Sequence, residues 1–179
     1  MLKMGTTGVI LTLWVGLVVV GFWWFEFRHW RTLDDALYQF DGHQLRLPES
    51  LKNQSGIKLV HYLDESCYCS LRQRQHLLDA SWSSADLIQT VVKPGLIEGR
   101  EVPATPAVAI WNEQNELAYF GPYSAGGLCG VGQDFVSRVL QALSARKNPQ
   151  WINTLAKGCY CPWPKEVLDE EQHVDATTL

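Results

Sequence analysis

An uncharged stretch near the amino terminus constrains this chain more than any other feature. Gly5 to Phe25 runs for twenty-one residues without Asp, Glu, Lys or Arg. As a helix rising 1.5 Å per residue it would be about 31 Å long, enough to cross the hydrocarbon core of a bilayer. A cleaved signal peptide is the alternative, but its apolar region is shorter and ends in small residues. This stretch ends in Phe-Trp-Trp-Phe at 22–25, so we expect residues 1–27 to be a retained transmembrane anchor in contact with membrane lipid.

The flanking charges give a weak indication of orientation, because Lys3 precedes the stretch and Arg28 and Arg31 follow it. Short N-terminal tails usually stay in the cytoplasm before a signal anchor. The chain has five cysteines, four of them in two CxC pairs, which suits a compartment where thiol–disulfide chemistry occurs. We therefore expect a single-pass inner-membrane protein whose soluble domain is periplasmic, if the source is a Gram-negative bacterium.

Composition allows one globular domain beside the anchor. The chain has 179 residues, of which 46% are hydrophobic and 19% charged. The net charge is −4 with no basic stripe, so a nucleic-acid partner is not expected. We expect 28–55 to be a linker with a short amphipathic helix between about Thr32 and Phe40. Residues 56–148 are then the domain, and 149–179 a cysteine-containing extension with an acidic tail.

Hydrophobic patterns in the central segment predict an α/β fold. Apolar runs between turn signals predict strands at 57–63, 86–92, 104–111 and 116–120. Apolar residues at helical spacing predict helices from about Cys67 to Ala80 and over 134–145. Residues 48–56 are predicted to be a loop. The order β-α-β, β-hairpin, helix indicates an α/β sandwich with a mixed sheet.

A strand that leads into a cysteine pair at a helix start, then Thr105-Pro106, a hairpin and a last helix, resembles the thioredoxin superfamily over roughly 57–145. More closely, Cys67-Tyr68-Cys69-Ser70, Phe120-Gly121-Pro122-Tyr123 and the run 158–163 are similar to an uncharacterised proteobacterial family of membrane-anchored thioredoxin-like proteins with a CxCS motif. The resemblance implies a thioredoxin-like sandwich with a mixed central sheet. The chain departs from thioredoxins in its CxC spacing and in His61, which stands where they carry a buried acid.

Cys67 falls where a strand ends and a helix begins, a location that favours a thiolate. Unpaired N–H groups and the helix dipole stabilise negative charge there and lower the pKa of a thiol. A thiolate is the species that attacks disulfides. Arg72 and Arg74 would assist it, whereas Asp64 and Glu65 would oppose it. We expect Cys67 to be an accessible catalytic cysteine.

The short spacing leaves the fate of the pair open. A Cys67–Cys69 disulfide closes a tighter ring than CxxC allows, and strained disulfides are more readily reduced. The pair is either oxidising or isomerising, or its two cysteines do not bond to each other. In that last case the resemblance aligns Ser70 with the resolving cysteine of thioredoxins, and Cys69 needs a distant partner. Two inert thiols at a helix start are a further alternative.

Pro106 after Thr105 resembles the cis-proline that faces the cysteines in thioredoxin folds, because cis X-Pro bonds mark tight turns. The resemblance implies that the backbone of Thr105 is free to pair with an extended substrate. A trans proline at a strand start is the alternative, and Pro103 is a rival for the role.

The remaining cysteines each have more than one interpretation. Cys129, in a glycine-rich loop, could resolve a mixed disulfide or be a small buried apolar residue. Cys159 and Cys161 could be a second redox pair, a structural disulfide that holds the tail, or half of a metal site. Under the metal alternative, Cys67, Cys69, Cys159 and Cys161 bind copper or zinc. With five cysteines, at least one thiol stays unpaired within the chain.

The residues together indicate a membrane-tethered thiol–disulfide oxidoreductase that acts on protein thiols or disulfides and requires no cofactor. Cys67 attacks, Cys69 or Cys129 resolves, and Thr105 and Pro106 shape the substrate groove. His61 could shuttle a proton or be an ordinary core histidine, and His76 could join a copper site. A copper- or other metal-binding module and a non-catalytic thioredoxin-fold adaptor are the alternative functions.

Overall fold

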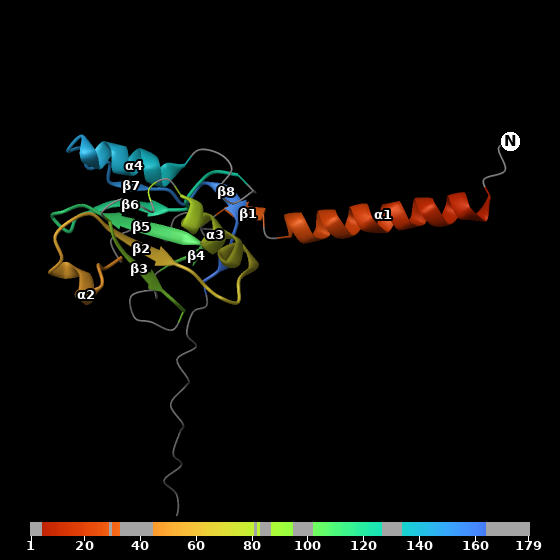
Figure 1. The fold of residues 1–179 in the computed structure, drawn as a ribbon, viewed down its shortest axis with the longest axis horizontal. Helices are drawn as coiled ribbons and strands as arrows, with labels where there is room; N and C mark the ends of the chain where they lie inside the picture. The colour runs from red at the N-terminus through yellow and green to blue at the C-terminus, as the bar shows by residue number, and fades with distance from the viewer. Residues whose placement is uncertain are drawn as a thin grey trace, which may run out of the picture.

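The uncharged N-terminal stretch forms α1 (Thr6–Phe27), which projects away from an α/β domain (Figure 1). Its segment Thr6–Phe25 is long and apolar enough to span a membrane, and none of that segment is buried against the rest of the protein. The structure is a computed structural model, and it describes residues 5–28, 30–32, 45–80, 82, 87–94, 102–126 and 134–163. The predicted apolar helix is therefore present, with the length that a bilayer requires.

A mixed five-stranded sheet forms the centre of the domain. Its strands are β2 (Lys58–Tyr62), β3 (Ile88–Val92), β5 (Ala107–Trp111), β6 (Leu117–Gly121) and β7 (Trp151–Ile152). They lie in the order β3-β2-β5-β6-β7. The β2–β3 and β6–β7 pairs are parallel, whereas β5 is antiparallel to both β2 and β6. All of β2 and β5 is buried, as continuous apolar runs predict for strands covered on both faces.

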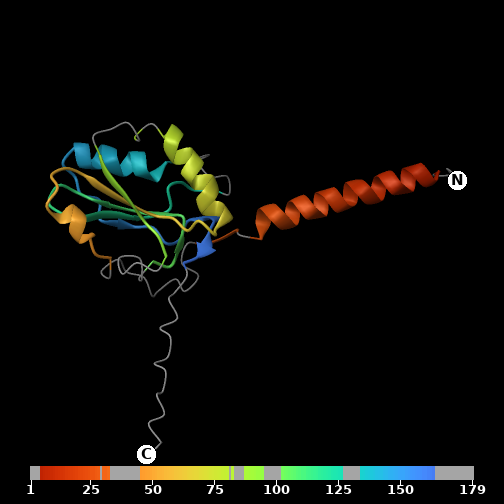
Figure 2. The ribbon, with the colours of Figure 1, turned by 60° about the horizontal axis from the view of Figure 1, so that its bottom comes forward.

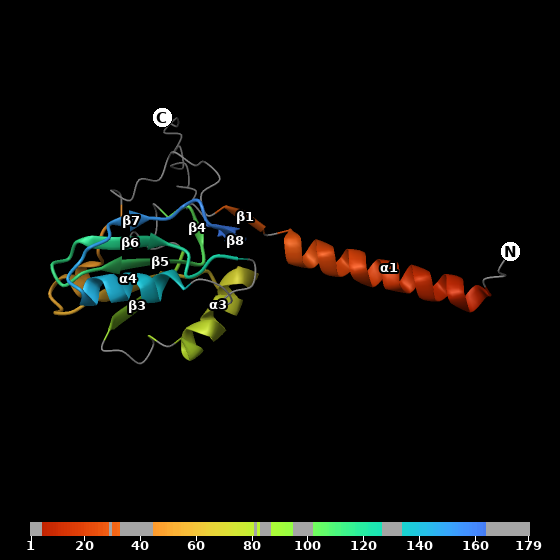
Figure 3. The same ribbon diagram turned by 90° about the horizontal axis from the view of Figure 1, so that it is seen from above.

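Helices α3 (Tyr68–Asp79) and α4 (Phe135–Ser144) lie on the same side of the sheet (Figures 2 and 3). Both match helices predicted from periodicity. Asp134 caps α4 by accepting a hydrogen bond from the Ser137 backbone N–H. The apolar faces of the helices join sheet residues in one core cluster that includes Leu59, Val108 and Val136.

The opposite side of the sheet is covered by segments outside the central 56–148 region. The short helix α2 (Glu49–Lys52) contributes Leu51 to a second core cluster, together with Tyr160 and Trp163 from the C-terminal segment. The prediction of an uninterrupted loop over 48–56 is therefore wrong, because Leu51 gains burial by forming a helical turn after Pro48. The amphipathic helix expected near Thr32–Phe40 falls almost wholly outside the described residues, and the predicted domain boundaries stay a prediction.

Two small antiparallel pairs complete the domain at the end nearest α1. β1 (Trp30–Thr32) pairs with β8 (Lys157–Cys159), and β4 (Ala104–Thr105) pairs with β9 (Cys161–Pro162). The strand predicted over 104–111 is thus divided at Pro106 into β4 and β5. The C-terminal strands were not predicted, because two or three residues are too few to show a strand period.

Candidate disulfide site

The two CxC motifs are joined to each other by two disulfides. Cys67 is bonded to Cys161 and Cys69 to Cys159, with Cα–Cα distances of 6.0 and 5.6 Å. The first cysteine of the first motif is thus bonded to the last cysteine of the second motif, and the two remaining cysteines are bonded to each other. In this state Cys67 and Cys69 are not bonded to each other, and the distant partner that Cys69 needs is Cys159. Cys129 lies outside the described residues.

Cys67 occupies the helix start that the sequence predicts. It is the N-cap residue of α3, and its backbone N–H donates to the Asp64 carbonyl over 3.1 Å. Its Sγ lies 4.0 Å from the Thr105 carbonyl oxygen, and the Thr105–Pro106 peptide bond is cis. The structure therefore brings together Cys67, Thr105 and the cis-proline, as the resemblance implies.

The C-terminal strand lies across this site. Thr105 pairs with Cys161 in the β4–β9 ladder, and the Trp163 N–H donates to the Pro103 carbonyl over 3.3 Å. The Trp163 side chain is buried, with its ring edge-to-face on Tyr62 at 5.9 Å between centroids. As a result Cys67 is only 3% exposed and Cys69 is 0% exposed. The expectation of an accessible Cys67 is therefore wrong for this state, because β9 covers it.

Buried hydroxyl groups connect the start of α3 to the cis-proline turn. The Thr105 Oγ1 donates to the Tyr62 carbonyl over 2.9 Å and lies 2.6 Å from Ser70 Oγ. Ser70 Oγ also accepts from the Asp64 N–H over 3.3 Å. Ser70, at the position that the resemblance aligns with a resolving cysteine, thus holds the turn against the helix.

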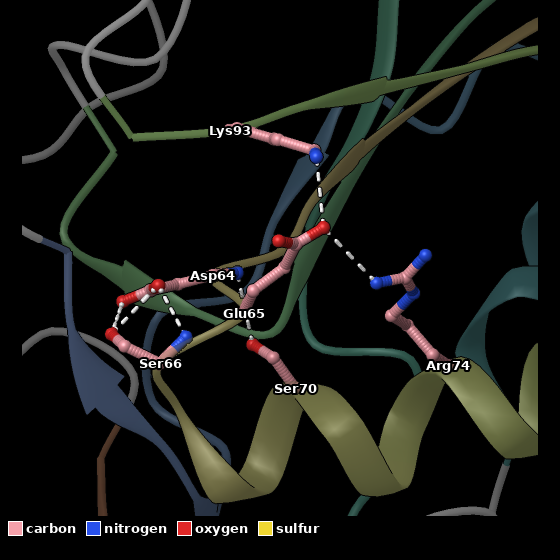
Figure 4. Close-up of polar contacts among 6 residues, drawn as sticks. All are labelled: Asp64, Glu65, Ser66, Ser70, Arg74 and Lys93. Atoms are coloured by element: carbon pink, nitrogen blue, oxygen red, sulfur yellow. Dashed lines mark hydrogen bonds and ion pairs between the residues drawn. The ribbon is translucent and has the colours of Figure 1, made fainter.

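Charged groups around the Cys67 loop are paired with one another (Figure 4). Glu65 Oε1 lies 2.8 Å from Lys93 Nζ and 3.3 Å from an Arg74 guanidinium nitrogen, and the hydrogen bond from Lys93 lowers the pKa of the Glu65 carboxyl. The Asp64 carboxylate accepts from the Ser66 N–H and hydroxyl at 2.9 and 2.8 Å. Arg74 therefore neutralises Glu65 instead of facing Cys67. Arg72, the other predicted assisting residue, lies over the Tyr68 ring at 5.8 Å.

The start of α3 and the strand β8, which carry Cys67 and Cys159, lie at the end of the domain from which α1 departs (Figure 1). The Phe25 ring near the end of α1 is 5.1 Å from the Tyr68 ring, which stands between the two cysteines of the first motif. Trp30 pairs with Cys159 in the β1–β8 ladder. Only two residues separate α1 from Trp30, a gap that spans at most about 10 Å. Both disulfides are thus held close to the end of the domain from which α1 departs.

His61 is engaged on the α3–α4 side of the sheet. Its Nδ1 is 2.8 Å from the Tyr123 hydroxyl and its Nε2 is 3.0 Å from Gln89 Oε1. The imidazole stacks on Trp82 and Tyr123, and burial lowers its pKa below the ordinary 6.5. These contacts agree with the core-histidine interpretation; the proton-shuttle role stays a prediction.

Two adjoining cavities lie beside the disulfides. The larger, of about 280 Å³, is lined by residues of α3 and its surroundings, including His76, Trp82 and Asp134. The smaller, of about 20 Å³, is lined by Pro106 and Cys159 among others. Gln73, Tyr123 and Ser124 line both, so the two cavities are neighbours. His76 lines the larger cavity, and its place in a copper site stays a prediction.

Three sulfur atoms of the site form a tight cluster. The Sγ atoms of Cys67, Cys69 and Cys161 all lie within 4.8 Å of one another. Disulfide sulfurs exchange partners with thiolates, and reduced thiolates bind soft cations. The arrangement is compatible with redox chemistry and with metal binding.

Comparisons with known proteins add a family but no activity. A family model described as Domain of unknown function (DUF6436) matches residues 37–163, a range that includes both CxC motifs. Among solved structures, a hypothetical protein from Sinorhizobium meliloti 1021 is similar, with 10% identity over 61% of this chain and 79% of that chain, and a TM-score of 0.42. No curated protein matches the chain.

Proposed function

The chain belongs to the DUF6436 family, and we propose that it is a membrane-tethered thiol–disulfide oxidoreductase with a thioredoxin-like fold, acting on protein thiols or disulfides. The observation that carries this proposal is that two disulfides join the CxC motif at the start of α3 to the C-terminal CxC motif. Cys67 Sγ there lies 4.0 Å from the carbonyl oxygen of Thr105, which precedes the cis-proline. No cofactor is needed, because the disulfides themselves carry the electrons.

Topology supports the thioredoxin-like part of the proposal. The strand that leads into Cys67, β2, lies between β3 in parallel and β5 antiparallel. The helix α3 follows it after a short loop, residues 63–67, and packs on the same face as α4. A cis-proline immediately precedes β5. These are the relationships that the resemblance implies among the first strand, its cysteine helix and the hairpin.

In the proposed reaction, Cys67 thiolate attacks a disulfide of a partner protein. A Cys67–partner bond forms, and one partner sulfur leaves as a thiolate. The Cys161 thiolate then attacks Cys67 Sγ, which restores the Cys67–Cys161 disulfide and releases the second partner thiolate. The partner gains two electrons and this protein loses two. Run in reverse, the same steps oxidise a partner dithiol.

Anchoring supports an action close to the bilayer. The Phe25–Tyr68 contact and the pairing of Trp30 with Cys159 hold the site beside the exit of α1. We propose that the domain is periplasmic on the inner membrane, since disulfides persist in that compartment.

The reactivity of Cys67 tests the proposed function. The full chain is purified in detergent with Cys129→Ser, fully reduced, and treated with iodoacetamide near neutral pH. Mass spectrometry then follows each remaining cysteine separately. Reduction breaks the Cys67–Cys161 bond that ties β9 over Cys67, and we expect this to let the reagent reach the sulfur. Cys67 should then alkylate about tenfold faster than free cysteine, because a thiolate at the start of α3 is stabilised by the helix N-terminus. If it alkylates no faster than free cysteine, the oxidoreductase function is wrong.

A trapping variant provides the second test. In Cys161→Ser, the mixed disulfide between Cys67 and a partner cannot be resolved by its observed bonding partner. Mixed disulfides should therefore accumulate on Cys67 in cells. The matched control, Cys129→Ser, keeps Cys161 and should accumulate none. Equal amounts of mixed disulfide in both variants would argue against the assigned roles.

The sulfur cluster favours a second candidate, a copper- or other metal-binding module in the reduced state. A tetrahedral ion with metal–sulfur bonds of about 2.3 Å holds its sulfur ligands about 3.8 Å apart. The Sγ atoms of Cys67, Cys69 and Cys161 all lie within 4.8 Å of one another, so small shifts would bring them to that spacing. Reduced protein should then retain one Cu⁺ or Zn²⁺ per chain after desalting, and Cys67→Ser should lose it. Retention equal to that of Cys67→Ser would eliminate the metal function.

A further inference from the structure

The start of α3 is exposed beside the end of α1, and we infer that it docks on the surface of the bilayer that α1 spans. The docking surface consists of Tyr68 and Leu71. Its occupant is phospholipid, at the boundary between the headgroups and the acyl chains. This inference rests on the membrane anchor of the proposed function and adds to it a lipid-binding surface on the domain itself.

The length of the apolar stretch sets the height of Tyr68 above the hydrocarbon core. The segment Thr6–Phe25 has 20 residues, which as a helix rise about 30 Å, the thickness of that core. Phe25 therefore lies at the hydrocarbon boundary when α1 spans the bilayer. The Tyr68 ring is 5.1 Å from the Phe25 ring, and the headgroup layer on each side is about 5–8 Å thick. Tyr68 is thus held within that layer as long as this ring contact persists.

Exposed apolar and aromatic side chains lie at this end of the domain. Tyr68 is 37% exposed, and Leu71, one turn further on the same face of α3, is 50% exposed. Trp30, in β1 at the same end of the domain (Figure 1), is 43% exposed. Tyrosine and tryptophan are enriched at the membrane–water interface, because each has an apolar ring and a polar tip. These residue types therefore fit a surface that touches both headgroups and acyl chains.

The charges beside the docking surface are compatible with lipid phosphates. Arg28 is exposed at the C-cap of α1, and the Arg72 guanidinium lies over the Tyr68 ring, 5.8 Å from its centre. Both cations are therefore held near the level at which lipid phosphates lie. The acidic Glu65 is paired with two cations of the domain, so its negative charge is compensated before it meets a headgroup.

The direction of α3 separates contact with lipid from general apolar exposure. The helix begins beside α1 and runs away from it (Figures 2 and 3). Leu78 lies about 15 Å further along the helix axis than Tyr68, and it is 82% exposed. Leu78 is thus more exposed than Leu71 but farther from the level of Phe25. A bilayer positioned by α1 contacts Leu71 and not Leu78, whereas a soluble partner that binds exposed leucine favours Leu78.

Docking through Tyr68 and Leu71 has a consequence for the cysteine beside them. Cys67 directly precedes Tyr68, and neighbouring Cα atoms are about 3.8 Å apart. The docked domain therefore holds Cys67 close to the headgroup layer. A partner sulfur that exchanges with Cys67 must then be presented at the membrane surface.

Photocrosslinking to lipid tests the docking surface without a change to any cysteine. The full chain with Leu71→p-benzoylphenylalanine is reconstituted in nanodiscs of phosphatidylethanolamine and phosphatidylglycerol and irradiated. Mass spectrometry then measures the fraction of the probe-bearing peptide that carries a lipid adduct. The matched control is Leu78→p-benzoylphenylalanine on the same helix, and Leu17→p-benzoylphenylalanine in α1 reports on the anchor. All three side chains are exposed, so the probe does not disturb the core.

We expect lipid adducts at positions 17 and 71, and at least about fivefold less adduct at position 78, because that position lies beyond the headgroup layer. An adduct at position 78 that equals or exceeds the one at position 71 would overturn the docking surface. So would the absence of adducts at both positions while position 17 reacts, which leaves the anchor in place. No adduct at position 17 would overturn the inference together with the anchor. The alkylation rate of Cys67 is measured in detergent and does not depend on these results, so failure of the docking surface is distinguishable from failure of the oxidoreductase function.

Discussion

Thr105 and Cys161 are partners in the antiparallel β4–β9 ladder, one residue before the cis-proline. The resemblance implies that the Thr105 backbone is free to pair with an extended substrate, and this expectation is wrong for this state, because the C-terminal segment of the protein itself pairs with Thr105. The same segment carries the sulfur that is bonded to Cys67. In this state the protein holds its own strand where a partner would be expected to pair.

The hydroxyl of Thr105 should contribute to stability through two buried contacts. It donates to the Tyr62 carbonyl and lies within hydrogen-bond distance of Ser70 Oγ. Thr105→Val leaves both groups without this partner and should lower the free energy of unfolding by about 1–3 kcal/mol. Thr105→Ser keeps the hydroxyl and should lose only about 1 kcal/mol for the missing methyl. Urea unfolding with the disulfides intact measures both, and a Val variant as stable as the wild type would contradict the contacts.

Gly158 should tolerate no side chain. A Cβ at this position would lie 2.6 Å from the Tyr160 hydroxyl oxygen and 3.1 Å from the Gly126 carbonyl oxygen, and Tyr160 is buried. Gly158→Ala should therefore destabilise the protein by about 1–3 kcal/mol. The matched control is Lys157→Ala at the exposed neighbouring position, which should change stability by less than about 0.5 kcal/mol. Thermal or urea unfolding that fails to separate the two variants would count against the packing of β8.

His61 should make the protein sensitive to acid. Burial lowers the pKa of its imidazole below 6.5 in the folded state, so the unfolded chain binds this proton more readily. The contribution of His61 to stability is then complete above about pH 6.5 and is lost as the pH falls below that value. His61→Gln, which does not titrate, should lose less stability than the wild type between about pH 7.5 and pH 5. Unfolding free energies measured across that range would contradict the prediction if the two curves ran parallel.

Asp134 should hold α4 and Trp82 together. Its carboxylate accepts from the Ser137 N–H over 3.1 Å and from the Trp82 indole N–H over 3.2 Å. Asp134→Ala removes both acceptors and should lower stability by about 1–2 kcal/mol. Asp134→Asn retains one acceptor oxygen and should lose less. Urea unfolding followed by circular dichroism provides the comparison, and an Asn variant less stable than the Ala variant would refute the capping role.

Local patterns were sufficient to predict the elements that position Cys67. The continuous apolar run predicts β2, and apolar residues at helical spacing predict α3 and α4, so all three elements are visible in the sequence. The cis-proline beside Cys67 was inferred from the resemblance and its place before the hairpin. These features depend on neighbours in the chain or on a known topology.

The covering of the site could not be predicted in the same way. β8 and β9 have three and two residues, too few for a hydrophobic period, and their pairing with β1 and β4 joins segments far apart in sequence. The disulfide partners are separated by 94 and 90 positions, and spacing alone does not determine connectivity. The pairing of Arg74 with Glu65 could not be predicted either, because it depends on how the loop before α3 lies against the helix.

The connectivity of the oxidised protein is the most direct test of this account. Cells that express the full chain are quenched with acid, and the protein is alkylated, digested and mapped by mass spectrometry. The account predicts Cys67–Cys161 and Cys69–Cys159 linkages between the two motifs. Linkages within the motifs, Cys67–Cys69 and Cys159–Cys161, would contradict it.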